Sequence, residues 1–206
     1  NFASCHRNTG PERPRRPRMS LILFNKPHGV MSQFSAHASR PTLADYLNQP
    51  DIYPAGRLDA DSEGLMLLTD NGSLQHDISH PDSKKEKTYL AQVEGVATQE
   101  QLQQLRTPLD LGDFITLGCR ASRIEPPHWL WERNPPVRER AHIPTSWLTI
   151  TLIEGKNRQV RRMTASVGLP TLRLVRSGMG PFSLATHPLL PGEWRDVGET
   201  AWQAAR

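Results

Sequence analysis

Cysteine is scarce in this sequence, with only Cys5 and Cys119 among 206 residues. Two cysteines are too few for a disulfide framework, and the chain has no Cys-x-x-Cys spacing of the kind that binds zinc. Long apolar runs are also missing: none approaches the ~20 residues that span a bilayer, and the first residues lack the apolar block of a secretion signal. We therefore expect a protein of a reducing, cytoplasmic compartment with no membrane segment.

Neither sign of charge dominates the composition. The chain carries 25 Lys and Arg against 21 Asp and Glu, a formal net charge of +4. This modest excess favours a polyanionic partner without proving one, because many soluble proteins are equally basic. The length is sufficient for one domain, or two small halves, around a real core.

Residues 1–18 offer almost nothing to a core, since Phe2 is their only large hydrophobic residue. Arginines alternate with prolines through this stretch, and such a segment cannot bury enough apolar surface to offset the entropy of ordering it. We expect a disordered basic tail that contacts nucleic-acid phosphates weakly. A tail that only improves solubility is the alternative. Folding should begin at residue 19.

The most unusual segment is residues 56–65, where Asp59, Asp61 and Glu63 alternate between two glycines, directly ahead of an apolar run. Carboxylates beside a core must be solvated, paired or metal-bound. The segment is therefore a candidate functional site on physical grounds alone.

Three interpretations of this segment compete. It could be a plain polar hairpin between strands near residues 52–53 and 65–68, with Asp and Ser bonding their own backbone in the turn. It could be a calcium loop, because its acids fall near EF-hand ligand positions, but Pro54 and Gly56 argue against the entering helix and no second loop exists. It could hold a nucleophilic acid kept ionised by a nearby cation.

Periodicity predicts the remaining elements. Expected strands are 21–24, 88–93, 117–124, 146–153 and 171–176. In the last of these strands, Arg173 and Arg176 should lie on one side. Expected helices are 42–47, 73–79, 98–106 and a segment ending at 167. Residues 125–144 are too rich in proline for a helix or central strand. Trp129 and Trp131 in that segment either stack on a ligand or pack on the core.

A cluster of arginines opens the last of these helices. Val160 and Met163 belong to its core stripe, whereas Arg158, Arg161 and Arg162 share a neighbouring face in the first turns. The helix dipole and mutual repulsion both disfavour cations there. Something anionic should neutralise them, and RNA phosphate or the Asp59 carboxylate are the natural candidates.

Taken together, these motifs resemble a known family. The run Gly-Arg-Leu-Asp-x-Asp-Ser-Glu-Gly-Leu at residues 56–65 resembles the signature of the pseudouridine synthases of the RsuA branch, in which the Asp after Arg-Leu is catalytic; here it is Asp59. The family's Asn-Lys-Pro-x-Gly turn has its counterpart at residues 25–29, its Lys-x-Tyr at 87–89 and its Arg-Gln-Val-Arg at 158–161.

The resemblance implies roles for particular residues. Tyr89 would stack on the target base, Arg161 would pair with Asp59, and Ile150 or Leu152 would supply an apolar wall beneath the base. The further substrate-binding candidates are Lys26, Arg57, Arg158 and Arg162.

Two of these roles leave alternatives open. Arg57 would fill the space left by an extruded base or read the opposing base, unless it forms a salt bridge within its own loop. Lys26 would contact RNA or serve the structure.

The resemblance covers about residues 20–197 and implies an α+β fold: the pseudouridine synthase catalytic fold, a long, mixed, mostly antiparallel sheet in two halves with a central active-site cleft. We expect this catalytic domain over residues 19–198, a C-terminal tail over 199–206 and no S4 RNA-binding domain. No cofactor or metal is expected. His76 and His80 sit four residues apart, but Pro81 ends their helix at once.

The branch type that lacks an S4 domain acts on 23S ribosomal RNA, with uridine 2457 as the expected target. The resemblance therefore implies 23S ribosomal RNA, or a large-subunit assembly intermediate, as the partner of a monomeric enzyme. A non-catalytic RNA-binding protein that uses the same basic cleft is the alternative.

Overall fold

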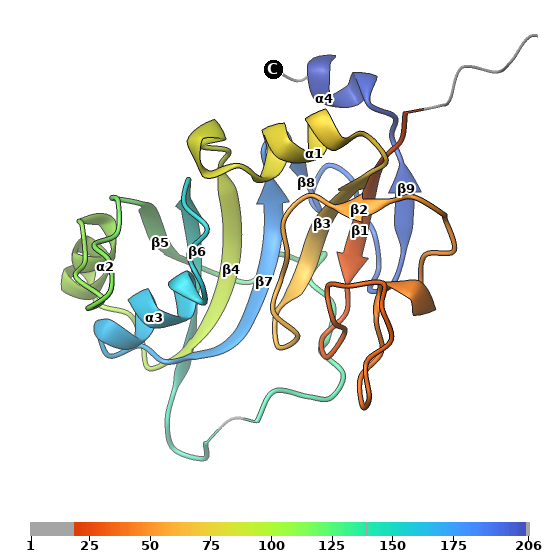
Figure 1. Ribbon diagram of the computed structural model, residues 1–206. Coiled ribbons are helices and arrows are strands. Elements are labelled where there is room, and N and C mark those ends of the chain that lie inside the picture. The colour runs from red at the N-terminus through yellow and green to blue at the C-terminus, as the bar shows by residue number, and fades with distance from the viewer. Residues whose placement is uncertain (1–18, 139, 205–206) are drawn as a thin grey trace, which may run out of the picture.

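The computed structural model describes residues 19–138 and 140–204, so the basic tail expected over 1–18 lies outside the described residues. Its centre is a nine-stranded sheet in the order β5-β6-β4-β7-β3-β1-β9, with β2 beside β3 and β8 beside β7 (Figure 1). The strands are β1 (Leu21–Lys26), β2 (Tyr53–Pro54), β3 (Glu63–Thr69), β4 (Lys87–Glu94), β5 (Arg120–Ile124), β6 (Thr145–Leu152), β7 (Thr171–Met179), β8 (Phe182–Ser183) and β9 (Trp194–Asp196).

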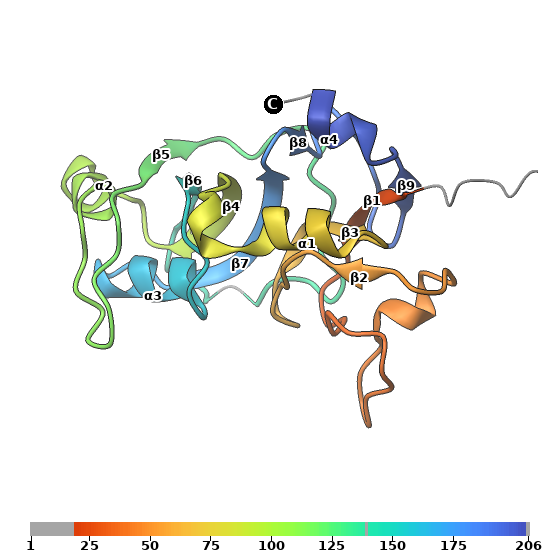
Figure 2. The same cartoon turned by 45° about the horizontal axis from the view of Figure 1, so that its top comes forward.

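Four α-helices and two 3₁₀ turns complete the described chain: α1 (Gly72–Ser79), α2 (Gln99–Arg106), α3 (Gln159–Ser166), α4 (Thr200–Ala204), η1 (Leu43–Asp45) and η2 (Pro81–Ser83). In both views α2 and α3 lie beside the β5–β6 end of the sheet, whereas α4 lies near β9 (Figures 1 and 2). The capping box predicted for α2 is present, with Thr98 and Gln101 exchanging side-chain-to-backbone hydrogen bonds.

The sheet consists of two antiparallel halves joined by one short parallel contact. That contact is between β3 and β7 and pairs Glu63 with Val175 and Gly64 with Arg176. The other strand pairings are antiparallel. The expected mixed, mostly antiparallel sheet in two halves is therefore confirmed.

Gly64 makes this junction possible. Its φ is +106°, and a Cβ added to it would lie 2.3 Å from the backbone oxygen of Arg176. Only glycine tolerates both the backbone conformation and the close approach of the neighbouring strand.

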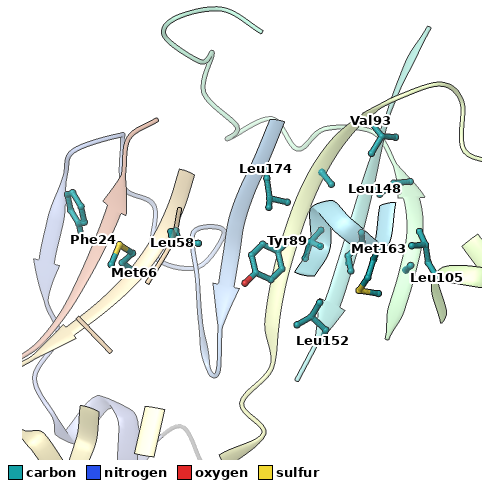
Figure 3. Packing of buried hydrophobic residues seen from close by; sticks show 14 of the residues in the cluster. Phe24, Leu58, Met66, Tyr89, Val93, Leu105, Leu148, Leu152, Met163 and Leu174 are labelled. Atoms are coloured by element: carbon teal, nitrogen blue, oxygen red, sulfur yellow. The ribbon is translucent and has the colours of Figure 1, made fainter. Parts of the chain in front are cut away.

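Two hydrophobic clusters cover opposite faces of the sheet. Ile22, Phe24, Met66 and Leu68 join the cluster that includes residues of α2 and α3, and ten members of it are labelled in Figure 3. The intervening residues of β1 and β3 join a second cluster with α1 and α4. Both strands are thus buried on both faces, which explains why their sequences are continuous apolar runs rather than alternating ones.

Four expectations about the elements need correction. Residues 117–119 are not part of β5, and the helix expected at 42–47 is only the short turn η1. The tail expected from residue 199 is instead helix α4 through residue 204, because Trp202 is 2% exposed and packs in the second cluster. Arg173 and Arg176 lie on opposite faces of β7, since positions three apart in a strand alternate.

Within the proline-rich segment 125–144, the described residues 125–138 form a loop anchored by Trp131. Its indole Nε1 donates to Glu63 Oε1 at 2.9 Å, and Glu63 forms a buried ion pair with Arg173 through bonds of 2.9 and 3.1 Å. The Arg173 guanidinium also lies over the rings of Trp131 and Trp147. Of the two interpretations of this loop, packing on the core is the one that the contacts of Trp131 support.

Candidate active site

A cleft of about 760 Å³ opens along the junction of the two half-sheets. The residues around it come from the loop before β3, from the α1–η2 connection, from β4 and β7, and from the segment that leads into α3. Five of the residues predicted from the sequence line it: Arg57, Asp59, Tyr89, Leu152 and Arg158.

The loop that carries Asp59 is fixed on both sides of that residue. The Ser32 hydroxyl donates to the Leu58 carbonyl oxygen at 2.6 Å and accepts from the Leu58 N–H at 3.1 Å. On the other side, the Gly29 N–H donates to the Ala60 carbonyl oxygen at 2.7 Å. The turn after β1 therefore holds the backbone of the Asp59 loop in one position.

Lys26 supports that turn and does not line the cleft. Its side chain is fully buried, and its Nζ donates to the carbonyl oxygens of Pro27 and Val30 at 3.0 and 2.8 Å. Burial lowers the pKa of Lys26 from 10.5 to about 7, although nearby carboxylates act in the opposite direction. Of the two roles considered for it, the structural one fits these contacts.

Arg158 is the cation beside Asp59. It occupies the residue before α3 with φ +49°, and this left-handed backbone conformation directs the guanidinium across the cleft. The Nη1 of Arg158 lies 3.4 Å from Asp59 Oδ2. Its Nη1 and Nη2 donate to the two carboxylate oxygens of Asp61 at 3.0 and 2.8 Å. Hydrogen bonding to Asp61 raises the pKa of Arg158, so its charge is secure.

Arg161 reaches the same loop but contacts a different residue. Its Nη2 donates to the Asp61 backbone oxygen at 2.8 Å, and its Nε lies 3.5 Å from Asp61 Oδ2. Within residues 19–138 and 140–204, the ion pair of Asp59 is with Arg158 and not with Arg161. The expected direct pairing of Arg161 with Asp59 is therefore corrected.

Asp61 is the residue that both Arg158 and Arg161 contact. Burial acts to raise its pKa, but the hydrogen bonds from Arg158 and the charge of Arg161 outweigh burial, so the pKa of Asp61 lies below its usual value. The anion required by the cationic start of α3 is thus supplied by the chain itself, in the loop that carries Asp59.

Arg162 points away from the cleft. It pairs with the Asp113 carboxylate, donates to the Leu111 carbonyl oxygen at 2.7 Å and lies over the Phe114 ring. These contacts tie α3 to the loop after α2, so the substrate-binding role expected for Arg162 does not fit its position.

The apolar wall of the cleft is formed by side chains of neighbouring strands. Figure 3 shows Tyr89 and Leu174 projecting from β4 and β7, with Leu152 from β6 near Tyr89. All three line the cleft, and Tyr89 is 9% exposed. Ile150 is fully buried beside Tyr89 in the sheet and is not among the lining residues, so Leu152 is the better placed of the two predicted wall residues.

Cations surround the mouth of the cleft. Arg57 is an exposed residue of the cleft. In the described part of the chain no carboxylate forms an ion pair with it. Asp61 pairs with Arg158, and Glu63 pairs with Arg173. Lys84 and Lys87 also line the cleft. Burial, followed by the charge of Arg176, lowers the pKa of Lys87.

Of the polar residues lining the cleft that sequence reasoning missed, Ser62 and Arg176 are the most deeply buried. Both are at least 98% buried and both line it. Strict alternation along 171–176, counted from a buried Leu174, would have placed Arg176 on the cleft face. Ser62 belongs to the signature run at residues 56–65, but the sequence assigns it no role of its own.

The metal-binding alternatives find no support in the geometry. Glu63 turns to Arg173 and Trp131, away from Asp59 and Asp61, so the acids of the calcium pattern do not converge. Among the residues that the structure describes, no group of three or more His, Cys, Asp or Glu is placed to hold a metal ion. The rings of His76 and His80 stack on each other, with centroids 4.5 Å apart.

Comparisons with known proteins identify relatives of this chain. A family model described as RNA pseudouridylate synthase matches residues 20–166. The chain is 55% identical over 177 residues to ribosomal large subunit pseudouridine synthase E of Vibrio vulnificus, covering 86% of this chain and 74% of that one. It is 52% identical over 188 residues to the protein of the same name from Xanthomonas campestris, covering 90% of this chain and 100% of that one.

Solved structures show the same fold at low sequence identity. A crystal structure of a pseudouridylate synthase has a TM-score of 0.73 at 24% identity and covers 91% of this chain and 74% of that one. Human RNA pseudouridylate synthase domain containing 1 has a TM-score of 0.56 at 13% identity and covers 95% of this chain and 90% of that one. Within residues 19–138 and 140–204, no helix has the length and apolar character needed to cross a membrane.

Proposed function

This chain belongs to the RNA pseudouridylate synthase family, and we propose that it converts one uridine of 23S ribosomal RNA to pseudouridine with Asp59 as the catalytic carboxylate. The family resemblance and the fold inferred from the sequence are thereby confirmed, and the chain is an RNA pseudouridine synthase. The target nucleotide and the roles of individual residues remain proposals.

The reaction sets clear chemical requirements. It breaks the bond from uracil N1 to the ribose, turns the base and rejoins it through C5, with no change of oxidation state and no energy source. It needs an ionised carboxylate, a cation beside that carboxylate, and a slot from which water is excluded.

The contact between Asp59 and Arg158 carries the proposal. A carboxylate fixed by backbone bonds on both sides lies 3.4 Å from a guanidinium, in a cleft whose wall includes Tyr89 and Leu152. A structural ion pair has no need of a 760 Å³ cleft beside it. A protein that only bound RNA would gain nothing from an acid placed inside its basic groove.

Arg158 and Arg161 take different parts in this proposal. Arg158 places its positive charge 3.4 Å from the Asp59 carboxylate. Arg161 acts through Asp61, whose backbone oxygen it holds at 2.8 Å, and is thus a positioning residue. Tyr89 supplies the ring that stacks on the base.

The target base must leave its helix before it can enter the cleft. Arg57, exposed at the mouth and without a carboxylate partner in the described part of the chain, is placed to occupy the vacated space or to read the opposing base. Its alternative role in a salt bridge with Asp61 or Glu63 does not fit, because other arginines already hold those acids.

The RNA substrate is inferred from the names of the relatives. Both of the similar proteins described above are called synthases of the large ribosomal subunit. We extend that substrate to this chain, with uridine 2457 of 23S ribosomal RNA as the expected site in free RNA or in an assembly intermediate.

The proposal is tested by mapping pseudouridine in unmodified 23S RNA fragments after incubation and carbodiimide labelling. Wild-type protein should modify a single uridine, and Asp59→Asn should modify none while still binding the fragment. Equal modification by the variant would remove Asp59 from the mechanism. Binding by the wild type without modification would favour the non-catalytic RNA-binding alternative.

A further inference from the structure

Two buried polar groups in the cleft have no hydrogen-bond partner within the described residues. They are the Nη2 of Arg176 and the Oγ of Ser62. Arg176 is 2% exposed and Ser62 is 1% exposed, yet both line the same cleft as Asp59 and Tyr89. Each of these two atoms exposes less than 1 Å² of surface, although its residue belongs to the lining of the cleft.

The position of Arg176 is tightly determined. It pairs with Tyr89 of β4 on one side and with Gly64 of β3 on the other, at the junction of the half-sheets. Its Nε donates to the Leu65 carbonyl oxygen at 2.8 Å, which fixes the plane of the guanidinium. The free Nη2 is thus held in one place rather than sampling several rotamers.

Ser62 lines the same cleft. It precedes β3 by one residue, on the face shared with Gly64, and its N–H donates to the Asp59 carbonyl oxygen at 3.0 Å. Side chains two residues apart in an extended segment point to the same side of the sheet. Ser62 therefore belongs to the lining of the cleft directly before the strand that pairs with Arg176.

A buried guanidinium with one nitrogen unpaired is costly, so the absence of a partner for Nη2 needs a reason. Removing a polar group from water without a new hydrogen bond costs on the order of 1–3 kcal/mol, and more for a charged one. Arg173, three residues earlier on the other face of β7, shows the usual solution: a two-point pair with Glu63. Arg176 lacks such a carboxylate among the described residues.

We propose that Arg176 and Ser62 form the polar floor of the base slot: the Nη2 of Arg176 donates a hydrogen bond to a carbonyl oxygen of the extruded uracil, and the Ser62 hydroxyl bonds the same edge of the ring. This inference rests on the proposed function. It assigns to both residues the recognition of the base, which Asp59, Tyr89 and Arg158 do not supply.

The chemistry of the reaction gives Arg176 a second task. When the N1–C1′ bond breaks, its electron pair passes to the ring and spreads onto the two carbonyl oxygens. A fixed cation at one of those oxygens stabilises this charge without reorganising. When C5 bonds to C1′ the ring returns the pair, C5 loses its proton and N1 gains one, so the product is an isomer of the substrate and Arg176 keeps all its protons.

The same contact discriminates between bases. Cytosine carries an amino group where uracil carries O4, so a donor from Arg176 would meet another donor. A site built around a hydrogen bond rejects a ligand that cannot make it far more strongly than an apolar pocket does. A donor placed at O4 would thus select uracil once the base is extruded, whereas a donor placed at O2 would not, because cytosine carries the same oxygen.

The test pairs enzyme variants with altered RNA. Single-turnover rates are measured at saturating protein on a 23S fragment whose target is uridine, 2-thiouridine or 4-thiouridine, because sulfur is the weaker hydrogen-bond acceptor. Arg176→Lys should lower the rate on uridine about 100-fold, with the RNA dissociation constant within about threefold of wild type. Ser62→Ala should lower the rate about fivefold.

In the wild type, sulfur in place of the carbonyl oxygen that Arg176 contacts should lower the single-turnover rate about tenfold. In Arg176→Lys the same sulfur should have no further effect, because the contact to Arg176 is already lost. The matched control is Arg173→Lys, which should lower the melting temperature but keep the wild-type sensitivity to sulfur. The thio series on wild-type protein also stands alone if a variant folds poorly. A methylphosphonate placed 5′ to the target reports whether Arg176 holds a phosphate instead.

Three outcomes would overturn the inference. The first is a rate for Arg176→Lys within threefold of wild type, and the second is a thio effect of the same size in both proteins. The third is a methylphosphonate effect that disappears in the variant while the thio effects persist. An active wild type with these results leaves the proposed function intact, whereas a wild type that modifies no uridine overturns both.

Discussion

Arg158 and Asp61 are joined by two parallel hydrogen bonds, 3.0 and 2.8 Å long, that connect the start of α3 to the loop before β3. The same guanidinium lies 3.4 Å from Asp59. One arginine therefore aligns the loop and supplies the charge next to the proposed catalytic acid. Two-point pairs of this kind fix geometry as well as charge.

Replacing Arg158 should affect turnover more than replacing its neighbours. Arg158→Ala removes the cation beside Asp59 and both bonds to Asp61, so we expect the single-turnover rate to fall about 100-fold. Arg162→Ala is the matched control, because Arg162 contacts Asp113 outside the cleft, and its rate should stay within about threefold. Equal losses in the two variants would show that the arginines act only as a general basic surface.

Lys26 makes stability depend on pH in a direction opposite to that of an ordinary surface lysine. Burial lowers its pKa to about 7 from 10.5, so between these values the unfolded chain binds more protons than the folded one. The free energy of unfolding should therefore rise with pH through this window, by about 2 kcal/mol between pH 7.5 and 9.5.

Urea unfolding at the two pH values measures this contribution. The rise should be absent in Lys26→Met and retained in Lys84→Met, whose side chain is exposed. Parallel pH dependences in the wild type and Lys26→Met would contradict the burial of a titrating amine.

Gly64 should tolerate no side chain. An alanine Cβ at φ +106° would lie 2.3 Å from the Arg176 backbone oxygen and would force the half-sheets apart. We expect Gly64→Ala to lower the free energy of unfolding by about 3 kcal/mol or more. Gly72→Ala, in the first turn of α1 with nothing within 4 Å, should raise it by about 0.5 kcal/mol. A stable Gly64→Ala protein would mean that the junction is looser than described.

Trp131 should matter for stability and not for RNA affinity. Trp131→Phe removes the indole bond to the buried Glu63 carboxylate, at a cost of about 1–2 kcal/mol in the free energy of unfolding. Trp129→Phe is the control and should cost less, because the Trp129 indole forms no hydrogen bond within the described part of the chain. If Trp131→Phe instead weakened RNA binding tenfold at unchanged stability, the stacking interpretation of this loop would be the right one.

How much of the site the sequence could predict depends on whether a residue acts locally. Asp59 and Tyr89 belong to contiguous motifs at the edges of predicted strands, and both line the cleft. The resemblance implies Arg161 as the partner of Asp59, whereas the structure pairs Asp59 with Arg158, which precedes α3 in a left-handed backbone conformation. Helical periodicity predicts the face on which each side chain of a helix lies, but not the side-chain direction of the residue before the helix.

For three other residues, the outcome depends on burial and pairing that the sequence does not show. Arg176 is notable for the partner that it lacks, and sequence does not record which buried groups remain unpaired. Lys26 was expected at the substrate or in the structure, and only its complete burial decides between them. Trp202 was assigned to a tail because a single tryptophan in a short polar segment gives no periodic signal.

The most direct test compares two neighbouring acids under single-turnover conditions on the same 23S fragment. Asp59→Asn should abolish pseudouridine formation while binding RNA as the wild type does, whereas Asp61→Asn, which weakens the alignment of the loop, should slow the reaction without stopping it. A measurable wild-type rate in Asp59→Asn would contradict the assignment of the catalytic carboxylate.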